Sequence, residues 1–423
     1  MGDGHESGRK HTIRDPGASD LTDSHSTTNG AKRARGDDNC AEMSRPVARL
    51  SVHPLSKYRT RCPAFSQPRE IVSFSYDHER RQVMDDRELK YYAAPSLDPA
   101  PCLFDGFERQ VQRDGAKNEH IDGLLGALAH LRAQGDARAA RDAQADFVMY
   151  RGMLTQLFVT PYSARDAWSM NATRVGPTIY IEENVTAEKI ADRAGADENH
   201  RRMMYSGYRF ETLCVVGAAP ETLAPQERAA RLGARADAVV NTNSEYCSVF
   251  RTRLGEHSVI AGAEVDCIDR AKPGELPSRY YRELKTSRVL DSERARGSFE
   301  RFKLLKFWAQ SFIAGIPTVT VGFRDDEGVL RAIQDLKTSD MPAMVRGKQR
   351  MWEPAVCMNF ADHALRTIKT HVREEGPEAQ YRVSFDPESC EMQVSFLGKC
   401  RPFLTPEYLA ALAAQQPAAS TAT

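Results

Sequence analysis

Two pairs of charged residues in the middle of the chain have the residue types and the spacing of a metal site. Glu264 and Asp266 stand two apart in the segment A-G-A-E-V-D, and Glu283 and Lys285 stand two apart in R-E-L-K. Side chains alternate between the faces of a β-strand, so each pair should point to one face of its strand. If the two strands are neighbours, three carboxylates and one ammonium group converge. Clustered carboxylates repel one another unless a cation lies among them, and their hard oxygen atoms suit Mg²⁺ or Mn²⁺.

The order of these residues is typical of the PD-(D/E)xK nuclease class, in which an acid on one strand is followed by E-x-K on the next. Here the pattern reads Asp266, Glu283 and Lys285. The chemistry explains the residue types, because bound metal ions polarise phosphoryl oxygen atoms and lower the pKa of water, while an ammonium group can orient that water. An alternative stays open, since a Glu and a Lys two apart on a strand are often a solvent-facing pair.

A fourth acid, Glu211, comes from the segment G-Y-R-F-E. Tyr208 and Phe210 alternate there with polar residues, which predicts a strand over 207–216. Glu211 then either joins the other acids or is a glutamate at the solvent edge of a sheet.

Three polar residues further along, Lys303, Lys306 and Gln310, are spaced so that they share one face of a helix over 299–314. That face is either solvated, with the lysine stems lying on apolar surface, or it meets the acids. In the second case Gln310 can hydrogen-bond a nucleophilic water or a phosphate, and the lysines can hold a phosphate backbone electrostatically.

The rest of the chain supplies the elements that must position these residues. Apolar residues at helical spacing from Ile121 to Leu131 predict an amphipathic helix. Further strands are expected over 178–181, 246–251, 258–268, 280–286 and 318–323, a further helix over 352–370, and a hairpin over 381–396. This mixture of helices and strands around a large sheet indicates an α/β or α+β fold.

Composition limits the class of protein. With 423 residues, 41% of them hydrophobic, the chain can bury a large core. Its 58 basic residues balance 58 acidic ones, so a polyanion must be held by local charge. Nine cysteines without a C-x-x-C pair argue against a structural zinc site or a disulfide framework and favour a reducing, intracellular compartment. The sequence contains no apolar run of membrane-spanning length and no secretory signal, so no membrane partner is expected.

The ends of the chain differ from its middle. Residues 1–45 lack an apolar period and are expected to be disordered, 46–405 to form a single catalytic domain, and 406–423 to be a flexible tail. Within the first tail, Lys32, Arg33 and Arg35 form a short basic patch. The patch is either a nuclear import signal or a group of solvated charges without a role.

Taken in order, several segments resemble those of the decapping exoribonuclease (DXO) family, which includes the fungal nuclear member that partners a 5′-to-3′ exoribonuclease. The segments are F-V-M-Y-R-G-M-L-T (147–155), G-Y-R-F-E (207–211), N-T-N-S-E-Y-C-S-V (241–249), G-A-E-V-D-C (262–267), E-L-K-T-S (283–287), K-L-L-K-F-W-A-Q-S-F (303–312), V-G-F-R (321–324) and W-E-P-A-V-C-M-N-F (352–360). The resemblance covers roughly residues 45–405. It implies two β-sheets flanked by helices, with a PD-(D/E)xK nuclease-like core.

The resemblance also implies roles for matching residues. Glu211, Glu264, Asp266 and Glu283 match the family's metal-binding positions, together with the backbone carbonyl of Leu284. The same four acids, with Lys285 and Gln310 close to the scissile phosphate, are the implied catalytic residues.

Substrate contacts are implied for a second group of residues. Arg151, in Y-R-G where many members have W-R-G, matches an arginine that contacts the substrate end, and its forked donors suit phosphate. Tyr150 keeps an aromatic surface beside it, Gly152 completes the motif, and Cys247 is expected in a loop that lines the substrate pocket. Glu264, Lys285 and Gln310 are implied to contact substrate as well.

The activity that the resemblance implies is hydrolysis at RNA 5′ ends with two Mg²⁺ or Mn²⁺ ions. Family members remove incomplete or non-standard caps such as NAD, release pyrophosphate from 5′-triphosphate RNA, and in some cases degrade the RNA from its 5′ end. The alternative is a chain that mainly binds and stabilises a nuclear 5′-to-3′ exoribonuclease and has little chemistry of its own. Nuclear residence is favoured over cytoplasmic residence.

Overall fold

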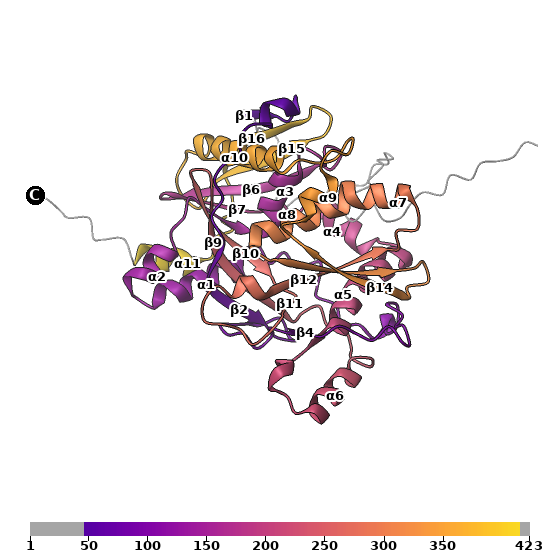
Figure 1. The fold of residues 1–423 in the computed structure, drawn as a ribbon. Coiled ribbons are helices and arrows are strands. Elements are labelled where there is room, and N and C mark those ends of the chain that lie inside the picture. Colours follow the sequence, from indigo (N-terminus) through magenta and orange to yellow (C-terminus); the bar gives the residue numbers. More distant parts are fainter. Residues whose placement is uncertain (1–45, 415–423) are drawn as a thin grey trace, which may run out of the picture.

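A computed structural model describes residues 46–414 of the chain. These residues form a mixed α/β fold built on two β-sheets with helices on their faces (Figure 1). The fold class predicted from the sequence is thereby confirmed. The expected disorder of 1–45 and the basic patch at Lys32, Arg33 and Arg35 lie outside the described residues, as does the segment 415–423.

The larger sheet has ten strands within 46–414. In spatial order they are β1 (Pro46–Ser51), β16 (Glu391–Lys399), β15 (Ala379–Asp386), β6 (Trp168–Val175), β7 (Thr178–Glu183), β5 (Phe147–Tyr150), β10 (His257–Glu264), β9 (Glu245–Leu254), β2 (Arg69–Tyr76) and β3 (Gln82–Val83). β5 lies parallel to both of its neighbours, β7 and β10, whereas β9 is antiparallel to β10 and to β2. The predicted hairpin is formed by β15 and β16.

The smaller sheet has six strands within the same range. In spatial order they are β14 (Leu330–Lys337), β13 (Thr318–Arg324), β12 (Tyr281–Arg288), β11 (Cys267–Ile268), β4 (Tyr91–Tyr92) and β8 (Val215–Val216). β12 lies at the middle of this sheet, parallel to β13 and antiparallel to β11.

Helices cover both sheets. They are α1 (Asp122–Ala133), α2 (Ala137–Asp142), α3 (Arg151–Val159), α4 (Ala187–Ala194), α5 (Glu198–Cys214), α6 (Pro225–Ala234), α7 (Glu293–Ser298), α8 (Leu304–Ala314), α9 (Met341–Val345), α10 (Pro354–His371) and α11 (Pro406–Ala413). A π-helical turn, Phe299–Lys303, leads into α8. The helices predicted over 121–131, 299–314 and 352–370 are confirmed. No helix within 46–414 combines the length and the apolar character that crossing a membrane requires.

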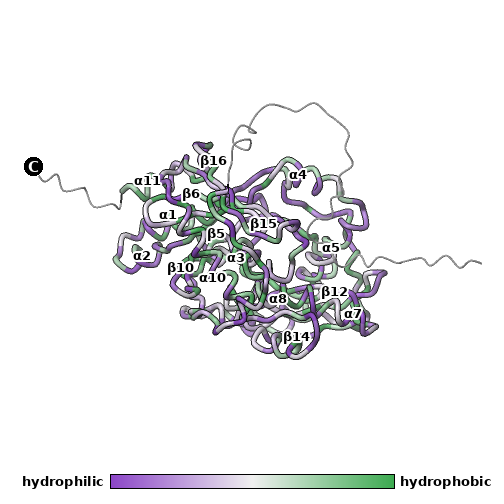
Figure 2. The backbone as a smooth tube through the Cα atoms, turned by 90° about the horizontal axis from the view of Figure 1, so that it is seen from above, coloured by the Kyte–Doolittle hydropathy of each residue, from purple (hydrophilic) through white to green (hydrophobic). Residues whose placement is uncertain are grey.

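Alternation along the central strands divides the core of the larger sheet into two layers. Phe147 and Met149 of β5 are buried with residues of α3, α8 and α10, whereas Val148 lies on the opposite face with residues of α1. Val259 and Ile260 of β10 divide in the same way. Figure 2 shows hydrophobic stretches gathered in the centre of the molecule, around β5, α3 and α8. Because both faces are covered, these strands appear in the sequence as continuous apolar runs.

The strand predicted over 207–216 is wrong. This segment is the second half of α5, and only Val215–Val216 is a strand. Buried residues in α5 recur every fourth position, as Tyr205, Arg209 and Leu213 do, which is a helical period. Tyr208 is exposed and Phe210 is buried. The apparent alternation of these two aromatic residues therefore came from two faces of one helix.

The single strand predicted over 258–268 is divided between the two sheets. β10 ends at Glu264 in the larger sheet, and the chain crosses through Val265 and Asp266 to β11 in the smaller one. β11, and not β10, pairs with β12. Glu264 and Asp266 therefore do not share one strand, because the chain changes sheet between them.

The flexible tail predicted from residue 406 is also corrected. Residues 406–413 form α11, which packs against α1. Thr405 caps this helix by accepting a hydrogen bond from the backbone N–H of Tyr408. Tyr408 is 1% exposed, and its hydroxyl lies 3.1 Å from that of Tyr180. The burial of Tyr408 thus anchors α11 to the domain, although the composition of this segment predicts a flexible tail.

Candidate functional site

Four acidic residues from the sequence analysis lie where the two sheets meet, each on a different element. Glu264 is the last residue of β10, Asp266 lies in the link between the sheets, and Glu283 is in β12. Glu211 is on α5, which packs against β12. Asp266, Glu264 and Glu283 all raise the pKa of Glu211 through their charge, so the structure brings the four acids together.

Close packing of α5 on the smaller sheet fixes the place of Glu211. Its neighbour Phe210 is fully buried in one cluster with Leu284 of β12. A Cβ atom at Gly322 of β13 would lie 2.5 Å from the Phe210 ring, so only glycine leaves room for the helix. The glycine of the V-G-F-R segment thus sets how deeply Glu211 approaches the other acids.

Glu283 is held by two cations. Its side chain is 1% exposed, and its two carboxylate oxygen atoms accept from different partners. Arg151 Nη1 lies 2.9 Å from Glu283 Oε2, and Lys285 Nζ lies 2.6 Å from Glu283 Oε1. Arg151 is the first residue of α3, directly after β5. Glu283 and Lys285 share one face of β12, as their spacing predicts, while Leu284 packs on the other.

The electrostatics of Glu283 confirm that it is compensated. Burial by itself would raise the pKa of this carboxyl, but Arg151 and Lys285 outweigh burial and lower its pKa to about 2. Burial would likewise lower the pKa of Lys285, and the charge of Glu283 raises it instead. The three groups therefore form a charged unit with a surplus of positive charge.

The other three acids are not compensated in this way. Burial raises the pKa of Glu211 well above its usual value, and the charges of Asp266 and Glu264 raise it further. Glu264 is exposed at the cavity, yet desolvation of its carboxyl by the surrounding protein and the charges of Glu245 and Asp266 raise its pKa to about 8. Burial and Glu283 raise the pKa of Asp266 to about 6. The ionised form of these three carboxyl groups is therefore disfavoured when no cation is bound.

This donor set fits a hard divalent cation. A cation among Glu211, Glu264 and Asp266 would remove the repulsion that raises their pKa, and carboxylate oxygen is the ligand that Mg²⁺ and Mn²⁺ prefer. Asp266 Oδ2 accepts a hydrogen bond from the backbone N–H of Leu284 at 2.6 Å, which places Leu284 beside the acids. As the side chains stand within 46–414, no group of three or more acidic, histidine or cysteine residues is close enough together to hold a metal ion.

A cavity of about 290 Å³ opens beside the acids and is lined by Tyr150, Cys247 and Glu264. The Tyr150 ring lies over Gly262, where a Cβ atom would be 2.8 Å from it. Cys247 stands opposite Glu264 in the β9–β10 register, so it is on a strand and not in the loop that was expected. Burial raises the pKa of Cys247 well above its usual value, which keeps the thiol neutral.

Ion pairs around the same cavity were missed by the sequence analysis. Arg80 Nη2 lies 2.9 Å from Glu119, and Arg80 Nη1 lies 2.7 Å from Glu245. Nearby, His120 Nδ1 lies 2.8 Å from Glu182, and this hydrogen bond raises the pKa of His120. Only Glu245, inside the segment N-T-N-S-E, carried a signal. Arg80 and Glu119 are 39 residues apart, and nothing in the sequence pairs them.

The structure assigns no role to the remaining residues of the sequence analysis. Gln310 is half-buried on α8 and forms no hydrogen bond with another residue of 46–414. Gly152 is exposed, and a Cβ atom there would meet nothing within 4 Å. Lys303 lies in the π-helical turn and Lys306 in α8. Their roles stay predictions.

Fold and site together define a nuclease of the PD-(D/E)xK class, with an acid at the crossing between sheets and E-x-K on a central strand. The family model described as "RAI1 like PD-(D/E)XK nuclease" matches residues 66–409. This match covers most of the chain, and the chain belongs to that family.

Known proteins agree with this assignment. The Decapping and exoribonuclease protein of Xenopus laevis is 35% identical over 349 residues, which cover 80% of this chain and 83% of that protein. The Decapping nuclease RAI1 of Neurospora crassa is 34% identical over 360 residues, which cover 83% and 84%. The crystal structure of Scheffersomyces stipitis Rai1 in complex with (3'-NADP)+ and calcium ion has a TM-score of 0.74 and 25% identity, covering 87% of this chain and 100% of that one.

Proposed function

We propose that this chain is a divalent-metal-dependent hydrolase of RNA 5′ ends that removes incomplete or non-standard caps. Its relatives are named decapping nucleases and decapping exoribonucleases. The observation that carries the proposal is the convergence of Glu211, Glu264 and Asp266, from α5, β10 and the link between the sheets, beside the ion-paired Glu283 of β12, which raises the pKa of all three. Uncompensated acids next to an open cavity create a binding site for cations.

The proposed cation site consists of Glu211, Glu264, Asp266 and Glu283, with the carbonyl of Leu284. When bound there, divalent cations, two in number by analogy with the family, supply charge that polarises a phosphoryl oxygen and lowers the pKa of water. The family match and the oxygen donors favour Mg²⁺ or Mn²⁺, and the calcium in the Scheffersomyces stipitis complex supports an oxygen-ligated divalent ion.

The chain's own cations hold the substrate in this proposal. Arg151 and Lys285 both contact Glu283, and their remaining N–H groups are proposed to bind the scissile phosphate. Glu283 keeps both of them charged and oriented. Gln310 is proposed to hydrogen-bond the water or the phosphate, while Tyr150, Gly152 and Cys247 form the wall that meets the 5′ nucleotide.

The substrate class follows from the relatives and from the cavity. The (3'-NADP)+ complex of the Scheffersomyces stipitis relative supports a dinucleotide cap such as NAD as one substrate. Release of pyrophosphate from 5′-triphosphate RNA and stepwise degradation from the 5′ end use the same attack on a phosphorus atom, so both belong to the proposal.

Product analysis tests it directly. RNAs that differ only in their 5′ end (triphosphate, unmethylated cap, NAD, monophosphate) are incubated with the full chain in Mg²⁺, in Mn²⁺ and in EDTA. We expect cleavage at the 5′ end in either metal and none in EDTA, with activity restored by adding metal. Exposed Glu188 provides a control, because Glu188→Gln removes an acid outside the site and should leave activity unchanged. Full turnover in chelator would overturn the proposal.

Nuclear residence and binding to a 5′-to-3′ exoribonuclease are proposed as well. Both come from the family resemblance. Nuclear residence is also suggested by the basic patch at Lys32, Arg33 and Arg35, which lies outside the described residues. The alternative of a mainly stabilising partner is separated by the double variant Glu264→Ala/Asp266→Ala. If it loses hydrolysis and keeps binding to the exoribonuclease, both roles exist in one chain.

A further inference from the structure

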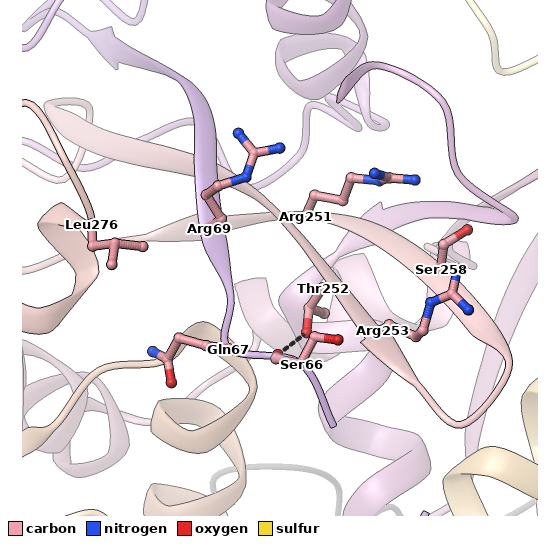
Figure 3. Close-up of a pocket in the computed structure, with 8 residues that line it drawn as sticks. All are labelled: Ser66, Gln67, Arg69, Arg251, Thr252, Arg253, Ser258 and Leu276. Carbon is pink, nitrogen blue, oxygen red and sulfur yellow. Dashed lines mark hydrogen bonds between the residues drawn. The ribbon is translucent and has the colours of Figure 1, made fainter. Parts of the chain in front are cut away.

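A second pocket lies on the larger sheet, away from the acids, and basic residues dominate it. Its volume is about 310 Å³, and it is lined by Arg69 of β2 and by Arg251 and Arg253 of β9, with Ser66 and Gln67 at its rim. Figure 3 shows the three arginine side chains leaving two neighbouring strands. We call this feature the arginine pocket.

The arginine pocket has more positive than negative charge. Arg69 stands directly opposite Arg251 in the β2–β9 register, and like charges at such positions repel. Asp142 of α2 accepts two hydrogen bonds from Arg69 and also lies 3.7 Å from Arg138. Burial would raise the pKa of Asp142, but Arg69, Arg138 and Arg251 lower it. One carboxylate thus serves several guanidinium groups.

Arg251 has a buried donor that no described residue accepts. Its Nε is buried without a hydrogen bond, and the side chain makes no hydrogen bond or ion pair with another residue of 46–414. Arg209 also has a buried, unpaired Nε, but its terminal nitrogens donate to backbone carbonyls of Ala236 and Ala238. Arg251 is half-buried, so its terminal nitrogens reach the pocket while its buried Nε lacks an acceptor, and an external acceptor would satisfy these donors.

Nearby groups do not supply that acceptor. Ser258, which stands opposite Arg253 across the strands, gives its hydroxyl to Asp146. Asp146 in turn pairs with Lys369. Arg253 is exposed and forms no ion pair with a described residue. Two guanidinium groups on one face of β9 therefore point into the pocket with donors to spare.

The arginine pocket is separate from the site of hydrolysis. Arg251 is four residue steps from Cys247 along β9, which is about 13 Å. Residues of α1 cover the sheet between them, since Val249 is buried in one cluster with Leu124 and Leu128. An RNA chain whose 5′ end lies among the acids would reach this pocket only with nucleotides further along.

We propose that the arginine pocket is a second phosphate-binding site, which holds the backbone of the RNA downstream of its 5′ end. Guanidinium groups bind phosphate through paired N–H donors, and the chain has no net charge, so RNA must be held at local sites of this kind. The identity of the ligand as RNA rests on the proposed function.

Binding measured in EDTA tests the inference without hydrolysis. Fluorescence anisotropy is recorded for a single-stranded RNA long enough to span both pockets, with the full chain at graded salt. For Arg251→Gln/Arg253→Gln we expect about tenfold weaker binding at low salt, and a dependence of log K on log salt that is less steep by about 1.4, the value for two lost phosphate contacts on a single strand. Arg253→Glu, at an exposed position, repeats the test if the double variant fails to fold.

Controls separate this inference from the proposed function. Arg228→Gln/Arg231→Gln removes the same charge from exposed positions of α6 and should leave affinity unchanged. Hydrolysis of a capped dinucleotide should be the same in wild type and in Arg251→Gln/Arg253→Gln. If wild type does not cleave that dinucleotide, the proposed function fails. The anisotropy measurement still shows whether the arginine pocket binds RNA. Unchanged RNA affinity and salt dependence in Arg251→Gln/Arg253→Gln would overturn the inference. If that variant loses only the binding of pyrophosphate and keeps its RNA affinity, the inference is also overturned, because the pocket would then be a small-anion site.

Discussion

Two clusters of charged and polar side chains lie near the meeting of the two sheets, and they differ in charge balance. In the first, Glu70 pairs with Lys272 at 2.9 Å and accepts hydrogen bonds from Ser248 and Tyr281 at 2.6 Å each. Lys272 also donates to the Tyr246 hydroxyl at 2.6 Å. We call this the Glu70 network. It contains one carboxylate and one ammonium group, and every member has a partner.

The second group is the acid cluster of Glu211, Glu264, Asp266 and Glu283. Four carboxylates meet two cations there, and only Glu283 is fully compensated. Burial would lower the pKa of Lys272 in the Glu70 network, yet Glu70 outweighs it and the pKa is raised. Burial alone therefore does not mark a functional site. An imbalance of clustered charge does, because a bound cation can remove it.

The largest effect is expected from Asp266→Asn. Removing one charge from the acid cluster should lower turnover on capped RNA at least about 10³-fold, because the cation loses a ligand. The melting temperature should stay the same or rise, since repulsion among the acids falls. Turnover is measured at saturating Mg²⁺ and unfolding by circular dichroism. Exposed Asp291→Asn is the control. A large loss of stability without loss of turnover would make the cluster structural.

A smaller loss is expected from Glu283→Gln. The amide is isosteric, so the fold should persist, but Arg151 and Lys285 lose the charge that orients them. We expect turnover to fall about 10²-fold, mainly in kcat. Circular dichroism of the variant checks the fold. Retained turnover would count against the role of Glu283 in holding the two cations.

The Glu70 network should respond in the opposite way. Lys272→Met leaves Glu70 without its cation, at side-chain exposures of 18% for Lys272 and 10% for Glu70. We expect the free energy of unfolding to fall by about 2–3 kcal/mol, at the lower end for a broken buried pair. Turnover per folded molecule should not change. The double variant Glu70→Gln/Lys272→Met should recover part of the lost stability. If folded Lys272→Met loses activity, the Glu70 network is not purely structural and the contrast between the two groups is wrong.

The smallest effect concerns pH. The pKa of Asp266 is raised to about 6 and that of Glu264 to about 8, so both acids hold protons at acidic pH when no cation is bound. A cation must displace these protons. Its affinity should therefore rise between pH 6 and pH 8, by about tenfold per pH unit for each proton displaced. Calorimetric titration with Mn²⁺ measures this, and a flat profile would contradict the raised pKa values.

Much of the acid cluster could be predicted from the sequence because its rules are local. Two-residue spacing placed Glu283 and Lys285 on one face of β12. Glu211 was predicted as a member of the acid cluster, but it was placed on a strand and not on a helix. The reason is that the spacing of Tyr208 and Phe210 matches a strand pattern over a few residues. The same limit hid the crossing at Asp266, since no local pattern shows that a chain changes sheet.

Contacts between distant segments could not be predicted. Arg80 and Glu119 meet only after the chain has folded, and Arg69 and Arg251 become neighbours through strand pairing. Tyr408 illustrates the same limit, since its burial against Tyr180 depends on where α1 and the larger sheet lie. Such positions follow from the topology of the fold. The sequence determines that topology, but no local pattern in a single sequence reveals it.

The crossing of the chain between Glu264 and Cys267 has a mechanical consequence. Because the larger sheet carries Glu264, the smaller sheet carries Glu283, and Asp266 lies on the bridge, an ion gripped by all three would fasten one layer to the other. Metal binding would then make the contact between the two sheets more rigid, so that the enzyme is rigid only in its metal-bound form.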